Sequence, residues 1–270
     1  MRVPRKNCTH LKRKCWRVYA PLALAVVLFA AVPARVAAAP EEIQVYTDDV
    51  NAPGEFSLEM HVNYVLEGPR TPGYAGQLPT NHVLQVTPEF SYGFAKNWDA
   101  GLYLLTARAA DGNLYANGAK LRVKYIAPAN GGVFWGINME VGRTSQRVTE
   151  SNTNIELRPI IGWRNDQWLV SFNPIIGAAV SGDVSREPSF APAIKVARAI
   201  KEGVQVGFEH YADMGGIHHI PAFNQQDHTF YGVVDIEKKG FDLNFGIVRA
   251  ITGGTPDKWV AKMIIGIPFK

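Results

Sequence analysis

One short pattern recurs along most of this chain. Apolar and polar residues alternate for about ten residues, a turn follows, and the alternation resumes. In the first instance Phe56, Leu58, Met60, Val62 and Tyr64 alternate with Ser57, Glu59, His61 and Asn63. Successive side chains of a strand point to opposite faces. Each segment therefore predicts a β-strand with one apolar and one polar face.

The pattern occurs about twelve times between Glu55 and Phe269. The predicted strands span about 56–64, 83–94, 99–104, 119–125, 133–142, 155–164, 168–176, 190–198, 204–211, 228–235, 241–247 and 259–269. Tight connections such as 165–167 alternate with longer ones such as 67–81. Outer-membrane barrels have short periplasmic turns and longer external loops, so the alternation of loop length is independent support for this architecture.

The predicted fold class is all-β, a single transmembrane antiparallel up-and-down β-barrel of about twelve strands. The alternation alone leaves open a soluble sandwich or a lipocalin-like barrel, in which the apolar face is buried. Aromatic residues such as Tyr92, Trp98 and Trp135 gather beside the tight turns, as in a membrane-interface girdle. Twelve strands also enclose more space than the eight whose side chains just fill a barrel. Both observations favour the membrane barrel.

The first 38 residues are predicted to be a cleaved signal peptide, and 39–270 the barrel. A basic leader precedes an apolar run from Pro21 to Val32 and then the small residues 36–39. The apolar run is shorter than the roughly 20 residues of a spanning helix, although an uncleaved anchor is the alternative. Residues 1–38 hold eight Lys and Arg, no Asp or Glu, and both cysteines. The rest of the chain therefore has a net charge of −4, and it has neither a thiol nor the basic patch of a nucleic-acid-binding protein.

Four prolines fall within predicted strands, at Pro88, Pro159, Pro174 and Pro192. Proline has no amide hydrogen to donate to a strand ladder. We predict that these positions mark bulges or bends of the wall. The alternative is that some of these strands are broken and the strand count is lower.

If the apolar face meets lipid, the polar face lines a lumen. The predicted lumen-lining residues, along a possible solute pathway, are Glu59, His61, Glu89, Lys120, Arg122, Lys124, Glu140, Glu156, Arg158, Lys195 and Glu209. Because unpaired charges are costly in an enclosure of low dielectric, many of these groups should pair across the lumen. Two interpretations stay open: a structural network, or a charged wall that selects a polar solute.

The sequence predicts no cofactor, no metal site and no catalytic residue. Asp213, His218, His219, Asp227 and His228 include metal-capable groups, but their spacing matches no closed metal site and they fall in a predicted external loop. The role of His218 and His219 stays undetermined. No nucleophile motif or His-x-Ser arrangement of barrel lipid hydrolases is present. A lipid-modifying barrel enzyme is therefore the least favoured function.

Three segments carry a family resemblance: 118–125 (GAKLRVKY), 207–211 (GFEHY) and 255–259 (TPDKW). With them, the layout of the chain resembles the outer-membrane barrels of the meta-pathway phenol-degradation (MetA-pathway) family. The resemblance implies an outer-membrane protein that passes small organic, often aromatic, solutes. The chain departs from the common barrel ending, because Lys270 follows Phe269.

The predicted function is passive passage of a small solute through a charged lumen in a bacterial outer membrane. The expected partners are outer-membrane lipid, a small-molecule solute and the barrel-insertion machinery, with no nucleic acid. The alternative is a closed structural or partner-binding barrel without transport.

Overall fold

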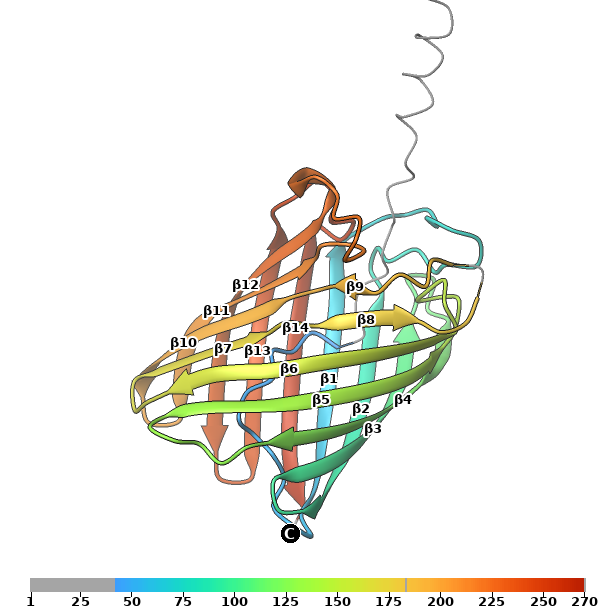
Figure 1. Ribbon diagram of the computed structural model, residues 1–270. Coiled ribbons are helices and arrows are strands. Elements are labelled where there is room, and N and C mark those ends of the chain that lie inside the picture. The colour runs from blue at the N-terminus through green and yellow to red at the C-terminus, as the bar shows by residue number, and fades with distance from the viewer. Residues whose placement is uncertain (1–41, 183, 270) are drawn as a thin grey trace, which may run out of the picture. The chain divides into compact units, whose positions relative to one another are not determined.

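The computed structural model describes residues 42–182 and 184–269, and the signal peptide predicted at 1–38 lies outside them. The described strands form one antiparallel sheet that closes on itself, because β5 pairs with β6 as well as with β4 (Figure 1). The prediction of an all-β antiparallel barrel is confirmed. Among the described residues, no helix has the length and apolar character needed to cross a membrane.

Fourteen strand segments and one short 3₁₀ helix make up the barrel. They are β1 (Phe56–Glu67), β2 (Leu84–Ala95), β3 (Trp98–Arg108), β4 (Leu114–Ile126), β5 (Val133–Thr144), β6 (Thr153–Arg164), β7 (Trp168–Asn173), β8 (Ile176–Ala179), β9 (Ser189–Phe190), β10 (Ala193–Lys201), β11 (Val204–Asp213), η1 (Phe223–Gln225), β12 (Asp227–Lys238), β13 (Phe241–Ala250) and β14 (Trp259–Phe269).

These segments build twelve wall strands. β7 and β8 both pair with β6 in one continuous register. β10 pairs with β7 and β9 pairs with β8, and these two pairings also share one register. β7 and β8 are therefore one wall strand with a short interruption, and so are β9 and β10. The predicted count of about twelve is confirmed. Tight and long connections alternate as predicted except around β4, where the connection 109–113 before it is shorter than the connection 127–132 after it. The tight turns lie toward the end of the barrel that holds the C-terminus (Figure 1).

The prolines interrupt pairing toward one neighbouring strand without inserting residues, so the predicted bulges do not form, and a bend of the wall stays a prediction. Pairing between β2 and β3 stops at Val86 and resumes at Glu89 in the same register, which skips Pro88. The registers also place Pro159 opposite Pro174, and Pro174 opposite Pro192. Each proline removes one ladder donor, and these three removals fall in one row across the wall. The chain breaks there between β7 and β8 and between β9 and β10, whereas β6 continues through Pro159, which stays paired with Ile137, and the strand count stays at twelve.

The two faces of the wall have the polarity of a membrane barrel. Large apolar side chains stand exposed on the outside, for example Met139 at 58% and Leu121 at 57% exposure. Charged side chains on the opposite face are buried, for example Lys262 at 1% exposure. A soluble barrel would have the reverse arrangement. Trp98, Tyr125 and Trp135 contact one another beside the tight turns, with ring centroids 4.8 and 5.8 Å apart, as an interface girdle requires.

The lumen is more apolar than the sequence predicts. Tyr231 and Val233 of β12 are 3% exposed and face inward, where they form an apolar cluster with Ile43 of the N-terminal segment. A second cluster inside the barrel includes Phe134 and Tyr46. The charged lumen predicted from the polar face is therefore incomplete, because part of the lumen is packed against the chain's own N-terminal segment.

Candidate functional site

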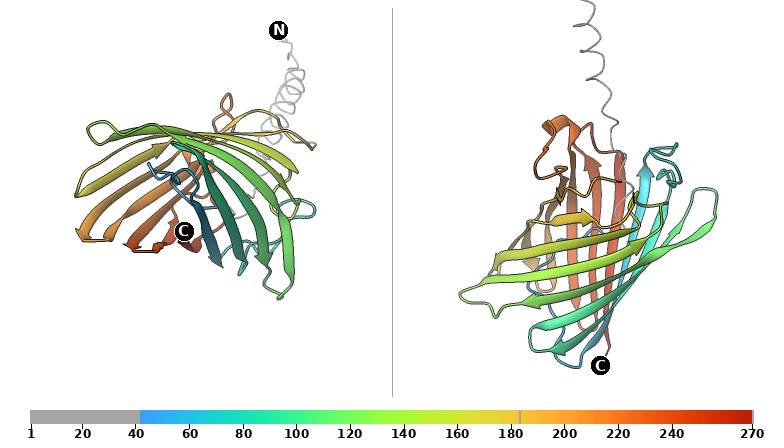
Figure 2. Two further views of the ribbon diagram at one scale, coloured as in Figure 1. Left: turned by 90° about the horizontal axis from the view of Figure 1, so that it is seen from below. Right: turned by 45° about the vertical axis from the view of Figure 1, so that its right-hand side comes forward.

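Residues 42–50 enter the barrel and cross its lumen without forming a strand (Figures 1 and 2). We call them the lumenal segment. Its backbone is bound by wall side chains: Tyr46 N–H donates to Asn173 Oδ1 at 2.7 Å, and Ser171 Oγ donates to the Tyr46 carbonyl at 2.6 Å. Lys262 Nζ donates to the Ile43 carbonyl at 3.0 Å. The sequence does not predict this segment, because the segment has no strand-length alternation and no motif.

Tyr46 is the central anchor of the lumenal segment and is 5% exposed. Its ring lies 4.3 Å from the Arg158 guanidinium and 5.3 Å from Lys124 Nζ, within the range of cation–π attraction. Its hydroxyl shares a 2.6 Å hydrogen bond with the Tyr103 hydroxyl and donates to Glu140 Oε1 at 3.3 Å. The wall therefore holds a phenol ring between two cations and binds its hydroxyl.

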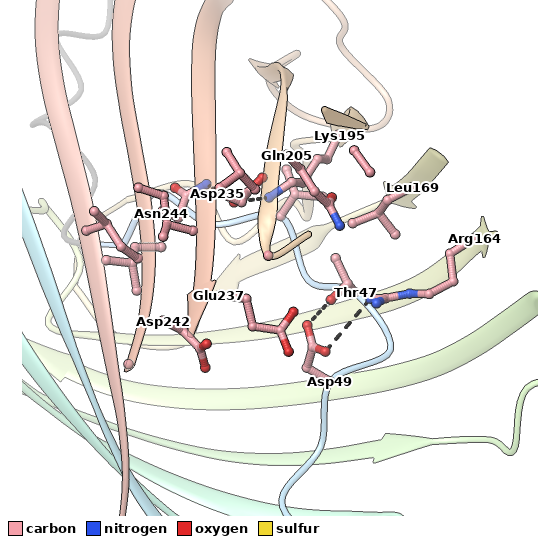
Figure 3. A pocket seen from close by; sticks show the side chains of 18 of the residues that line it. Thr47, Asp49, Arg164, Leu169, Lys195, Gln205, Asp235, Glu237, Asp242 and Asn244 are labelled. Atoms are coloured by element: carbon pink, nitrogen blue, oxygen red, sulfur yellow. Dashed lines mark hydrogen bonds and ion pairs between the residues drawn. The ribbon is translucent and has the colours of Figure 1, made fainter. Parts of the chain in front are cut away.

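The acidic side chains of the lumenal segment neutralise wall arginines. Glu42 lies 3.5 Å from the Arg158 guanidinium. Asp48 forms a close ion pair with Arg164, and Asp49 Oδ1 lies 3.8 Å from the same guanidinium (Figure 3). Removing the segment would therefore leave two cations facing the lumen with fewer partners.

Arg122 is the centre of one wall network. Its Nε donates to Glu89 Oε1 at 2.5 Å, and its Nη1 forms a close ion pair with Asp99. Lys124 Nζ lies 3.6 Å from the other oxygen of Asp99. Asp99 is not among the predicted lumen-lining residues, because it falls at the start of a predicted strand beside a turn. The inward alternation of β3, with Gly101 and Tyr103, is the signal that could have found it.

Lys195, Glu209 and Lys262 form the other wall network. Glu209 lies 3.3 Å from Lys195 and in close contact with Lys262. Lys195 also pairs with Asp235 at 2.7 Å, and Asn244 Nδ2 donates to Asp235 at 2.6 Å. Two cations and two carboxylates thus neutralise one another on the β10–β14 side of the lumen, and the Asn244 amide adds a hydrogen bond to Asp235.

All eleven predicted lumen-lining residues lie on the wall face opposite the exposed apolar side chains, and their place along a solute pathway stays a prediction. Beyond the two networks, Arg158 pairs with Glu156 at 2.8 Å, and Lys120 lies 3.9 Å from Glu140. The expected pairing across the lumen is wrong for most of them. Their partners lie on the same or nearby strands, because the lumenal segment stands between the opposite walls.

A cavity of about 680 Å³ lies below the lumenal segment at the tight-turn end (Figure 3). Thr47 and Asp49 form part of its inner wall, and Glu237 and Asp242 point into it from the turn between β12 and β13. The lining also includes one lysine from each wall network, Lys124 from the Arg122 network and Lys195 from the Glu209 network. The cavity is therefore a charged vestibule that ends at the lumenal segment.

Hydrogen bonds tie three long loops together at the other end of the barrel. Leu78 N–H donates to the Arg147 carbonyl at 3.0 Å, and Lys258 N–H donates to the Glu67 carbonyl at 2.8 Å. Thr80 donates a short hydrogen bond to Asp257, which is 6% exposed. Burial raises the pKa of Asp257 to about 6, so this contact between loops changes its charge near that pH.

The histidines of the external loop are not brought together. His219 Nδ1 lies 3.0 Å from Glu187 Oε2, on an exposed part of the loop. His228 instead meets His210 of β11, with Nδ1 and Nε2 3.1 Å apart and the rings stacked. Within the described residues, the one group of three or more metal-capable side chains is Glu59, His61 and Glu89.

The fold is shared with solved outer-membrane barrels. The COG4313 outer-membrane channel of Pseudomonas putida F1 superposes with a TM-score of 0.60 at 10% identity, over 84% of this chain and all of that one. The KdgM porin gives 0.55 at 11% identity, and the NanC porin 0.54 at 13%; each match covers 79% of this chain and 99% of the porin. No family model and no curated protein matches the sequence. The likeness establishes the barrel fold, and membership of the meta-pathway family stays a prediction.

Proposed function

We propose that the chain is a passive channel for small organic solutes in a bacterial outer membrane. The observation that carries this proposal is the charged vestibule of about 680 Å³, which leads to a lumen closed by a segment that belongs to no strand. Rings of charged side chains set selectivity in pores. Solved barrels with a similar fold include a channel and two porins.

The surroundings of Tyr46 support an aromatic solute. Arg158 and Lys124 flank its ring, and Tyr103 and Glu140 bind its hydroxyl. When the lumenal segment moves aside, these groups form a subsite for a ring that carries a hydroxyl. The two cations also favour a solute with a carboxylate. Outer-membrane lipid and the barrel-insertion machinery are the remaining partners that a barrel of this kind requires.

Planar-bilayer recordings test the channel. The protein beginning at residue 39 is compared with a variant lacking residues 42–50, and heat-modifiable gel migration confirms that both are folded. Discrete conductance is expected in both, severalfold larger in the variant because the deletion clears the lumen. Absence of conductance in both proteins at every voltage would overturn the channel.

A pair of matched anions tests the solute class. Liposome swelling is measured with 4-hydroxybenzoate and with cyclohexanecarboxylate, which have the same charge and similar size. Faster entry of 4-hydroxybenzoate is expected, and the difference should shrink in the Tyr103→Phe variant. Equal rates for the two anions would remove the aromatic solute and leave the channel standing.

The second candidate is a closed structural or partner-binding barrel. The lumenal segment favours it, because three apolar clusters and several hydrogen bonds hold the segment in place. This candidate predicts that only the variant lacking residues 42–50 conducts, while the protein beginning at residue 39 shows no conductance.

A further inference from the structure

Two carboxylates face each other on the lumen side of β1 and β2. Glu59 pairs directly with Glu89 in the strand register, and His61 occupies the next lumen-facing position of β1. Like charges directly opposite each other on neighbouring strands are unfavourable. A cation between them removes this repulsion, and an imidazole stands beside them to complete the ligand set.

The three side chains already approach the geometry of a metal centre. His61 Nε2 lies 3.2 Å from Glu89 Oε2 and 3.9 Å from Glu59 Oε2. The three ligand atoms lie within 4.8 Å of one another. In a tetrahedral zinc site with bonds of about 2.0 Å, ligand atoms are about 3.3 Å apart. Small rotations of the glutamates therefore suffice to bring the three groups around one ion.

Neighbouring groups orient the two glutamates as the outer shell of a metal site does, whereas His61 Nδ1 has no hydrogen-bond partner. Arg122 Nε binds Glu89 Oε1 at 2.5 Å and leaves Oε2 to face the imidazole. Gln44 Nε2 donates to Glu59 at 3.2 Å. Thr87, fully buried and paired with His61 in the register, has a hydroxyl without a hydrogen-bond partner. An ion or its bound water would supply that missing partner.

An ion can reach this place from the vestibule. Glu59 lines the cavity at the tight-turn end and its side chain is 30% exposed, whereas His61 and Glu89 are buried behind it. Glu59 is therefore the entrance to the site, and the other two ligands form its base.

We propose that Glu59, His61 and Glu89 bind a divalent transition-metal ion, with Zn²⁺ matching the mixed nitrogen and carboxylate set best. Three protein ligands leave a further coordination position open to water or to a solute carboxylate. The site ties β1 to β2 and adds positive charge beside the solute path. It stands on these ligands alone and does not depend on transport.

Isothermal titration of the detergent-solubilised protein with ZnCl₂ tests the site. One ion per chain is expected, and His61→Ala and Glu89→Gln should each weaken binding at least about tenfold. The matched control is the double variant His218→Ala and His219→Ala, which removes two exposed imidazoles and should bind Zn²⁺ like the unchanged protein. Unchanged affinity in His61→Ala, or a loss in the control alone, would overturn the proposal.

Co²⁺ provides a second measurement that needs no substitution. Bound to one imidazole and two carboxylates at a low coordination number, Co²⁺ should show a more intense visible absorption band than the hydrated ion, and Zn²⁺ should displace it. Heat-modifiable migration shows whether His61→Ala and Glu89→Gln remain folded. A Co²⁺ spectrum identical to that of the hydrated ion would count against the site even where both variants misfold.

Discussion

The twelve wall strands and the lumenal segment pack against each other inside the barrel, yet different interactions hold them. Wall strands bind one another through continuous backbone ladders, such as the register from Phe56 to Tyr64 between β1 and β2. The segment is bound by side chains, chiefly Asn173, Ser171 and Lys262, acting on its backbone. The wall is therefore a scaffold that cannot lose a member, whereas the segment can leave while the scaffold stays closed.

The largest effect should follow from breaking the wall's buried charge network. In Arg122→Ala, Glu89 and Asp99 lose their shared guanidinium, and breaking such a buried pair costs about 3–5 kcal/mol. Urea unfolding in lipid vesicles measures the change. The control is the exposed Lys96, whose change to Ala should leave stability near that of the unchanged barrel. Equal behaviour of the two variants would show that the network contributes nothing to the scaffold.

A charge on the lipid-facing side of the wall should cost somewhat less. Met139 is 58% exposed in the middle of β5. The Met139→Arg substitution should destabilise the barrel by about 2–4 kcal/mol, because it places a charge in hydrocarbon. Leu114, 79% exposed at the loop end of β4, should cost about 0–1 kcal/mol after the same change. The same vesicle unfolding measures both, and a similar cost at the two sites would contradict the membrane orientation.

The smallest effect on the barrel should come from the segment itself. Tyr46→Ala removes a buried side chain that stabilises the docked segment by roughly 2 kcal/mol, while the backbone ladders of the wall stay intact. Amide exchange of residues 43–50 should become at least tenfold faster, with global unfolding unchanged. Tyr92→Ala, on the outer face, is the control and should leave exchange of the segment as it was. Joint loss of wall and segment protection would show that the two form one cooperative unit.

The alternation in the sequence predicted most of the wall. It placed all eleven candidate lumen residues on the inner face and gave a strand count that the register confirms. The alternation fails in β12, where apolar residues occupy both faces at Phe230, Tyr231, Val233 and Val234. The structure explains the ambiguity: Tyr231 and Val233 pack against Ile43, a residue some 190 positions away in the sequence.

The features that the sequence did not predict depend on contacts between segments that are distant in the chain. The effect of the prolines could not be foreseen because Pro159, Pro174 and Pro192 line up only when three separate strands take their register. The grouping of Glu59 and His61 with Glu89 likewise depends on the pairing of β1 with β2. No spacing within one segment encodes such a juxtaposition.

The sequence by itself determined that this chain has strands with one greasy and one polar face, how many there are, and which side chains share a face, because the strand repeat of two is a local property of the backbone. Only the tertiary structure decided what fills the lumen and which charges pair there. Those outcomes depend on strand register and on the docking of a segment without any periodic pattern, and neither is set by neighbours in the chain.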